Sequence, residues 1–73
     1  MMINVDEFEA QWKEIRKQVR PRWQAITDAE VNSIGGHVDV LLDLLEEKYG
    51  YSRLLAEDEV SRFLQDMHPV RTS

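Results

Sequence analysis

Helix-breaking residues are the feature that most constrains the fold of this chain. Pro21, the pair Gly35-Gly36 and Gly50 divide the sequence into four segments, and apolar residues recur at helical spacing within each segment. Proline cannot donate to the helical ladder and disfavours helical geometry in the preceding residue, whereas glycine adopts the left-handed conformation that ends many helices. No alternating pattern typical of strands competes with this interpretation. The sequence therefore predicts an all-α fold of four short helices.

The first predicted helix lies between Asn4, which can cap it, and Pro21, which ends it. Glu7 occupies the third helical position, from which its carboxylate can reach back to the cap residue. Apolar residues at steps of three and four form the inward face: Phe8, Trp12, Ile15 and Val19. Trp12 and Trp23 could stack on nucleic-acid bases, but in so short a chain we interpret both as core residues.

The second predicted helix begins at Thr27 and ends at Gly35. Thr27 and Glu30 have the spacing of a reciprocal capping box, in which each side chain binds the other residue's backbone N–H. Val31 and Ile34 face inward one turn apart. Because two helical turns are unstable alone in water, this helix depends on its neighbours.

The third predicted helix begins at His37 or Val38 and runs to Tyr49. It has apolar residues on two faces, which is typical of a central helix that packs on more than one partner. Ser52 caps the fourth helix, and Pro69 closes it, so the tail from about residue 69 is expected to fray. The inward stripe of the fourth helix comprises Ala56, Val60, Phe63, Leu64 and Met67.

The length of the chain leaves room for one core, so we expect a single domain over residues 1–73. The short second helix and the tight breaks favour two helical hairpins packed roughly orthogonally over a long parallel bundle. The absence of cysteine excludes disulfides and thiolate metal sites and fits a reducing cytoplasm. No apolar run approaches the roughly 20 residues that span a bilayer, and the N-terminus lacks the layout of a secretion signal. We therefore expect a soluble cytoplasmic protein without membrane contact.

Little in the sequence could carry catalysis. Gly35-Gly36 lacks the additional glycines and the following lysine of a phosphate-binding loop. We therefore interpret the pair as a helix stop, and a helical hairpin that binds DNA phosphates is the alternative. His37 and His68 have no carboxylate at the spacing of a metal or catalytic site. A stripe on the third helix is interpreted as a solvated face, with weak divalent-cation binding as the alternative: Asp39, Asp43, Glu46 and Glu47. We predict a non-enzyme without a cofactor or a metal site.

Charge is distributed unevenly along the chain, whose net charge is −5. Residues 1–23 carry a balance of +1, whereas residues 24–50 carry −5. The basic side chains gather on one face of the first helix and just beyond it: Lys13, Arg16, Lys17, Arg20 and Arg22. This face could pair with the acidic third helix of the same molecule, or it could bind phosphate, an anionic surface or an acidic partner. The negative net charge disfavours nucleic acid as that partner.

The order of these landmarks resembles the CsbD-like family of small bacterial stress-response proteins. The similarity covers residues 8–64 and is carried in order by Trp12-Lys13, Trp23, Thr27-Asp28, Ile34-Gly35, Leu41, Leu45, the sequence EEKYG over residues 46–50, Ala56, Val60 and Phe63. The resemblance implies a small four-helix fold of two orthogonal hairpins in a cytoplasmic protein produced under general stress. It implies no established biochemical activity and no catalytic residues. Family members are usually rich in lysine and glycine along the first helix, whereas this chain has Ile15-Arg16 and no glycine there. Gly36-His37 also stands where a lysine-like position is common.

Together these features predict a small stress-associated protein that acts by binding. The leading hypothesis is a protein-interaction or self-associating helical module of unknown partner, whose contact surface is an apolar patch at Val40 and Leu44 on the second face of the third helix. The first helix could equally cover that patch. The alternative function is binding of nucleic acid or another polyanion through the basic face of the first helix.

Overall fold

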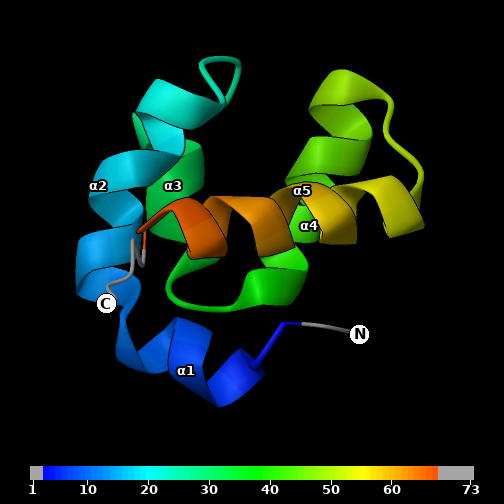
Figure 1. Cartoon of the computed structure of the whole chain (residues 1–73). Coiled ribbons are helices and arrows are strands. Elements are labelled where there is room, and N and C mark those ends of the chain that lie inside the picture. The colour runs from blue at the N-terminus through cyan, green and yellow to red at the C-terminus, as the bar shows by residue number, and fades with distance from the viewer. Residues whose placement is uncertain (1–2, 68–73) are drawn as a thin grey trace.

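The computed structural model describes residues 3–67, which form helices and no strand (Figure 1). The helices follow one another as α1 (Val5–Ala10), α2 (Trp12–Arg22), α3 (Asp28–Ile34), α4 (Val38–Tyr49) and α5 (Arg53–Met67). The all-α prediction is confirmed for these residues. The predicted number of helices is wrong by one, because the first predicted helix is divided into α1 and α2.

The division of the first predicted helix lies at Gln11, whose backbone leaves helical geometry at φ −102° and ψ 11°. Gln11 bonds to both helices, since its N–H donates to the Glu7 carbonyl at 3.0 Å and its carbonyl accepts from the Ile15 N–H at 2.9 Å. The bend turns α1 beneath the rest of the molecule, where it contacts α4 as well as α2 (Figure 1). Ile3 and Phe8 are buried there. No proline or glycine marks Gln11, so the bend depends on packing between distant segments and not on local sequence.

The predicted stop at Pro21 is also wrong, because Pro21 lies inside α2, which continues to Arg22. A proline in the last turn removes only one N–H from the ladder, and the helix ends before a second bond is affected. The last turn closes where the Trp23 N–H donates to the Val19 carbonyl at 2.8 Å. Trp23 is buried at this corner and meets the ring of Phe63 edge-on at 4.9 Å, as expected for a core residue.

The predicted boundaries of α3 are confirmed by the atoms that cap it. The Glu30 N–H donates to Thr27 Oγ1 at 3.2 Å, and the Thr27 N–H donates to Glu30 Oε1 at 2.9 Å, which completes the capping box. Gly35 ends the helix in the left-handed conformation at φ 55°.

Local signals also place the ends of α1, α4 and α5. The Asn4 side chain accepts from the Glu7 N–H at 2.9 Å at the start of α1. Gly50, at φ 69°, ends α4 as predicted. Ser52 Oγ accepts from the Leu55 N–H at 3.1 Å at the start of α5. The predicted stop at Pro69 and the expected fraying of the tail lie outside the described residues.

Helix α4 is central, because it packs against α1, α3 and α5. This confirms the interpretation of its two apolar faces. Figure 1 shows α5 running across the front of the other helices, while consecutive helices lie side by side. The buried apolar side chains form one cluster, joined at its edge by the partly buried Trp12, Leu64 and Met67. The arrangement as two orthogonal hairpins stays a prediction.

Candidate interaction surfaces

A groove between α2 and α3 contains most of the predicted basic face. Its volume is about 650 Å³, and it is lined by Lys13, Arg16, Lys17, Arg20, Asp28, Val31 and Asn32. Four basic residues and one acidic residue therefore meet on this surface. The three-four spacing along α2 brings the cations to one side of the helix, and α3 supplies the opposite wall.

Both arginines of the groove are held against α3 and the loop before it. Arg16 Nη2 donates to Asn32 Oδ1 at 2.9 Å. Arg20 Nε donates to the Ile26 carbonyl at 3.0 Å, and its Nη1 pairs with Asp28 Oδ1 at 3.0 Å. These contacts fix the positions of the two guanidinium groups, and within the described part of the chain only Arg20 has a carboxylate as its partner.

The two lysines of the groove are more open to solvent. Lys17 pairs with Glu14 at 3.7 Å, and both side chains are largely exposed. Lys13 is exposed and has no ion-pair partner among residues 3–67. Exposed pairs of this kind contribute little to stability, so both ammonium groups are available to an anion in solution.

Arg22 does not belong to the groove. Its Nη1 pairs with Asp66 Oδ2 of α5 at 2.7 Å, and its guanidinium lies 5.8 Å from the ring centroids of both Trp23 and Phe63. Arg22 therefore contributes to the packing of α5 on the end of α2. Arg22 is still part of α2, but it follows Arg20 by two residues, which puts its side chain on another side of the helix from the other four cations.

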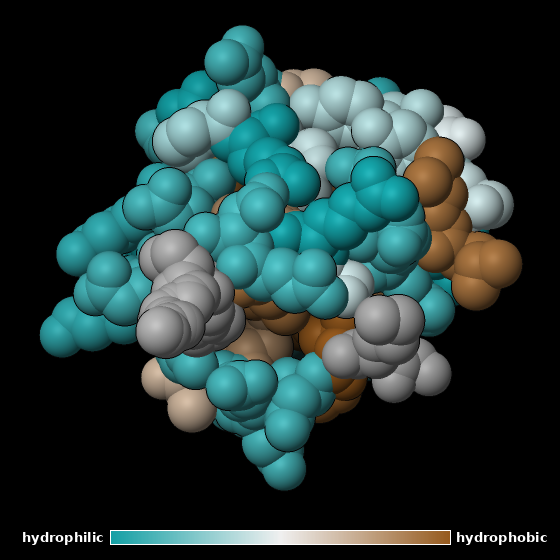
Figure 2. All heavy atoms as spheres, viewed as in Figure 1, coloured by the Kyte–Doolittle hydropathy of each residue, from teal (hydrophilic) through white to brown (hydrophobic). Residues whose placement is uncertain are grey.

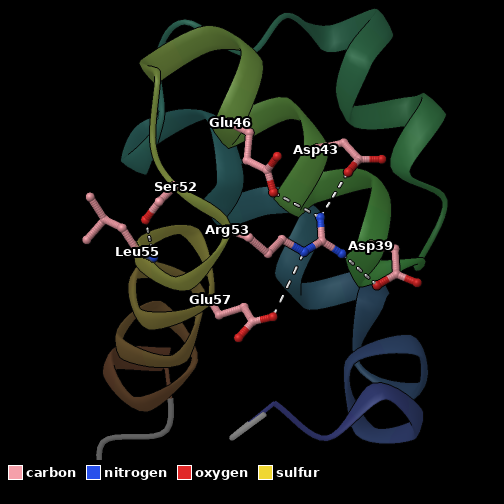
Figure 3. A network of polar contacts seen from close by, with 7 residues as sticks. All are labelled: Asp39, Asp43, Glu46, Ser52, Arg53, Leu55 and Glu57. Carbon is pink, nitrogen blue, oxygen red and sulfur yellow. Dashed lines mark hydrogen bonds and ion pairs between the residues drawn. The ribbon is translucent and has the colours of Figure 1, made fainter.

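The expected pairing of the basic face with the acidic third helix is wrong for the described residues. The cations of α2 pair with Glu14, Asp28 and Asp66, none of which is in α4. The acidic stripe of α4 faces a different cation, Arg53, at the start of α5 (Figure 3).

Arg53 lies among four carboxylates, three from α4 and one from its own helix (Figure 3). The distances are 2.9 Å from Nη1 to Asp43, 3.2 Å from Nη1 to Glu46, 3.4 Å from Nη2 to Asp39 and 3.9 Å from Nε to Glu57. The hydrogen bond to Glu46 is the largest of the effects that raise the pKa of Arg53. Three members of the stripe therefore form a contact between α4 and α5 in which Arg53 offsets part of their negative charge, so the stripe is not a purely solvated face.

A second ion pair joins α3 to α4. Lys48 Nζ lies 2.7 Å from Glu30 Oε2, and both side chains are mostly covered. The hydrogen bond to Lys48, together with the one from the Thr27 backbone, lowers the pKa of Glu30. Glu30 thus caps its own helix and anchors the next one.

The predicted apolar patch at Val40 and Leu44 is wrong as an exposed surface. Leu44 is only 9% exposed and belongs to the core, and Val40 is partly buried against it. The physical reason is the central position of α4, whose apolar faces are covered by neighbouring helices on several sides.

The apolar side chains that do reach solvent lie at the start of α5. Leu54 is 78% exposed and Leu55 is 42% exposed. In the chain they follow Tyr49 and Tyr51, whose rings stack at 5.4 Å. Figure 2 shows hydrophobic atoms protruding at the right edge of the molecule, where the first turn of α5 lies in the same view of Figure 1. We call Leu54 and Leu55 the α5 leucine patch.

The sequence contained a signal for this patch that the prediction did not use. Leu54 and Leu55 precede Ala56, where the inward stripe of α5 begins, so a helix that buries the stripe turns at least one of them outward.

Nothing among residues 3–67 points to catalysis. No group of three or more histidine, cysteine or acidic residues in that range could hold a metal ion. His37 is exposed at the start of α4 and makes no capping hydrogen bond, and His68 lies outside the described residues. No helix in the described part of the chain is long and apolar enough to cross a membrane.

The pair Gly35-Gly36 is a turn packed against α2. Gly36 has φ 88°, and a Cβ built on it would lie 3.5 Å from Cβ and Cγ of Trp12. Its surroundings are therefore an aromatic side chain and the α1 residue Glu9, with no basic side chain among the nearest atoms. This geometry favours the interpretation as a helix stop over a phosphate-binding loop.

Comparison with known proteins gives relatives that cover most of the chain. UPF0337 protein PA4738 of Pseudomonas aeruginosa is 34% identical over 61 residues, which are 84% of this chain and 94% of the relative. The chain belongs to the UPF0337 family. A UPF0337 protein of Protochlamydia amoebophila is 38% identical over 66 residues, or 90% of this chain and 98% of that protein. YjbJ of Escherichia coli, also a UPF0337 protein, is 36% identical over 58 residues, or 80% and 84% of the two chains.

UPF0337 is the CsbD-like family, so these relatives agree with the resemblance found in the sequence. The UPF0337 names carry a family and no activity, ligand or partner. No family model matches the chain, and no solved structure matches it.

Proposed function

We propose that this UPF0337 protein is a non-enzymatic module that associates with a second copy of itself through the α5 leucine patch. The observation that carries the proposal is the 78% exposure of Leu54 beside the partly exposed Leu55. An apolar side chain of this size contributes about 1.5–3 kcal/mol when it is fully removed from water, so covering it favours association.

The surroundings of the patch are compatible with a second copy. The net charge of −5 would make two copies repel each other if the contact were acidic throughout. Along the chain, however, the patch follows Arg53 and precedes Glu57 and Asp58, and Asp58 pairs with Arg62 at 3.2 Å. Charges of both signs therefore surround the leucines, and a symmetric contact can bring opposite charges together.

The small size of the patch sets the strength of the contact. Stable interfaces bury about 800 Å² on each partner, and two leucines supply a fraction of that area. We therefore expect a weak, reversible dimer whose population rises with concentration, with a dissociation constant on the order of 0.1–1 mM.

Sedimentation equilibrium over a series of protein concentrations tests the proposal. The wild-type chain is expected to shift from monomer to dimer, and Leu54→Gln is expected to remain monomeric because it removes apolar area without changing the charge. Val5→Gln is the matched control, since Val5 is 49% exposed on α1 and lies outside the patch. A wild-type protein that stays monomeric throughout, or equal loss of dimer in both variants, would refute the proposal.

We also propose that the protein acts in the bacterial cytoplasm under stress. The absence of cysteine fits a reducing compartment, and the CsbD-like resemblance implies production in stress. Immunoblots of cell fractions before and after stress test this setting: protein that stays at constant abundance, or that is found outside the cytoplasmic fraction, would contradict it.

A further inference from the structure

The groove between α2 and α3 concentrates positive charge on a chain that is otherwise acidic. Four cations and one carboxylate line it, whereas the whole chain carries −5. The single carboxylate, Asp28, is already paired with Arg20. Lys13, Arg16 and Lys17 therefore provide an excess of positive charge. Among residues 3–67, the one carboxylate that pairs with any of these three is Glu14, 3.7 Å from Lys17.

The partner of Arg16 has a particular consequence for binding. Asn32 Oδ1 accepts one hydrogen bond from the guanidinium at 2.9 Å but carries no negative charge. The contact fixes the position of the guanidinium and leaves its charge uncompensated. The Ile26 carbonyl likewise fixes Nε of Arg20 at 3.0 Å, although the charge of Arg20 is compensated by Asp28. Each guanidinium has five N–H donors, so donors remain on both arginines for an anion in the groove.

The spacing of the cations fits several anionic groups in a row. Lys13 and Arg20 are seven residues apart on one helix, which corresponds to about 10 Å along the axis. On one strand of a duplex the phosphates recur about every 3.4 Å along the axis, and a flexible chain can adjust that spacing, so about three phosphates fit this distance. Arginine binds phosphate through two parallel N–H bonds, and lysine adds a point charge.

From this geometry we infer that the groove of Lys13, Arg16, Lys17 and Arg20 binds consecutive phosphate groups of a flexible polyanion. A flexible chain can place a few phosphates in the groove while it avoids the acidic remainder of the protein. A rigid duplex presents charge far beyond the groove and is repelled there. Phosphate chains come from two sources, inorganic polyphosphate and single-stranded nucleic acid, and the groove recognises the chemistry that they share.

Binding of labelled polyphosphate and of a labelled single-stranded oligothymidylate at low salt tests the inference. Contact with about three phosphates predicts that the logarithm of the binding constant falls with the logarithm of salt concentration with a slope of about −2. Lys13→Glu is expected to weaken binding roughly tenfold and to make the slope shallower by about 0.7, since one phosphate contact is lost. Lys13 lies in the first turn of α2, where glutamate is favoured by the helix dipole, so the fold should be retained.

Arg62→Glu is the matched control, because it changes the net charge equally at an exposed position on α5. It should weaken binding much less than Lys13→Glu. Tighter binding of the oligothymidylate assigns the groove to nucleic-acid strands, tighter binding of polyphosphate assigns it to the inorganic chain, and equal binding supports recognition of phosphate alone. The inference is overturned if neither probe binds, if both variants lose affinity equally, or if poly-glutamate of the same charge binds as tightly as the phosphate chains.

Discussion

At the scale of single residues, Gly36 combines an unusual backbone conformation with a packed position. Its φ of 88° lies beyond the left-handed region that side-chain-bearing residues tolerate best, and it is buried beside Trp12. The nearest contact of an added Cβ, 3.5 Å, is an ordinary van der Waals distance. We therefore expect Gly36→Ala to reduce the free energy of unfolding by about 1–3 kcal/mol through backbone strain and not through a steric clash.

Gly35→Ala is the control for this prediction. Gly35 has φ 55° and ψ 28°, which is close to the left-handed minimum, and it is exposed. Gly35→Ala should lower the free energy of unfolding by about 1–2 kcal/mol, which is less than the loss expected for Gly36→Ala. Urea unfolding of the two variants gives the comparison, and a larger loss at Gly35 would contradict the prediction.

Glu30 should make part of the stability depend on pH. Its folded-state pKa is lowered by the hydrogen bond to Lys48 and then by that from the Thr27 backbone. A carboxyl whose pKa is lower in the folded protein stabilises the fold above its unfolded pKa, about 4.3, and loses that contribution as the pH falls through the folded value. Glu30→Gln should therefore be less stable than wild type at neutral pH, and the difference should shrink in acid. Urea unfolding of wild type and Glu30→Gln at neutral and at acidic pH measures this difference in stability. A difference that is independent of pH would disprove the role assigned to the Glu30 carboxylate.

At the scale of helices, Arg53 should be a main electrostatic link between α4 and α5. Arg53→Met leaves Asp39, Asp43 and Glu46 of α4 without the cation that separates their charges. We expect lower stability than in wild type, with the loss greatest at low salt, because screening weakens the repulsion between the remaining carboxylates. Thermal unfolding at two salt concentrations tests this expectation.

Arg62→Met is the comparison for Arg53→Met. Among the residues that the structure describes, Arg62 pairs only with Asp58 of its own helix, and such an exposed pair contributes little to stability. Its loss should change the melting temperature less and with weaker salt dependence. Equal effects of the two substitutions would show that the link between α4 and α5 does not depend on Arg53.

For the helices, some features could be predicted from the sequence and others could not. The limits of α3 and α4 were predictable, because caps such as Thr27 and stops such as Gly50 act within a few residues. The bend at Gln11 was not, because it depends on α1 reaching α4. The four groove cations were predictable from spacing along α2, whereas Asn32, which holds Arg16 without neutralising it, is 16 residues away. The contact of Arg53 with the acidic stripe likewise exists only once α5 folds back on α4.

At the scale of the whole molecule, stability depends on few residues because the core is small. Domains have about 0.05–0.15 kcal/mol of stability per residue, so a chain of 73 residues has about 4–11 kcal/mol in total. Leu42 is fully buried in α4, the helix that contacts α1, α3 and α5. Leu42→Ala should cost about 2–5 kcal/mol, since the cavity left behind adds to the lost burial. We expect it to lower the midpoint of urea unfolding steeply or to abolish the cooperative transition.

Leu54→Ala removes the same atoms from an exposed position and isolates the effect of burial. It should change the free energy of unfolding by less than about 0.5 kcal/mol, because no cavity forms and little packing is lost. The pair therefore separates two roles of leucine in one small protein: Leu42 holds the helices together, and Leu54 remains available for contact with a second copy. Similar losses of stability in the two variants would mean either that α4 is not the centre of the fold or that Leu54 is already covered. If Leu54 is covered, the proposed association surface on α5 is wrong as well.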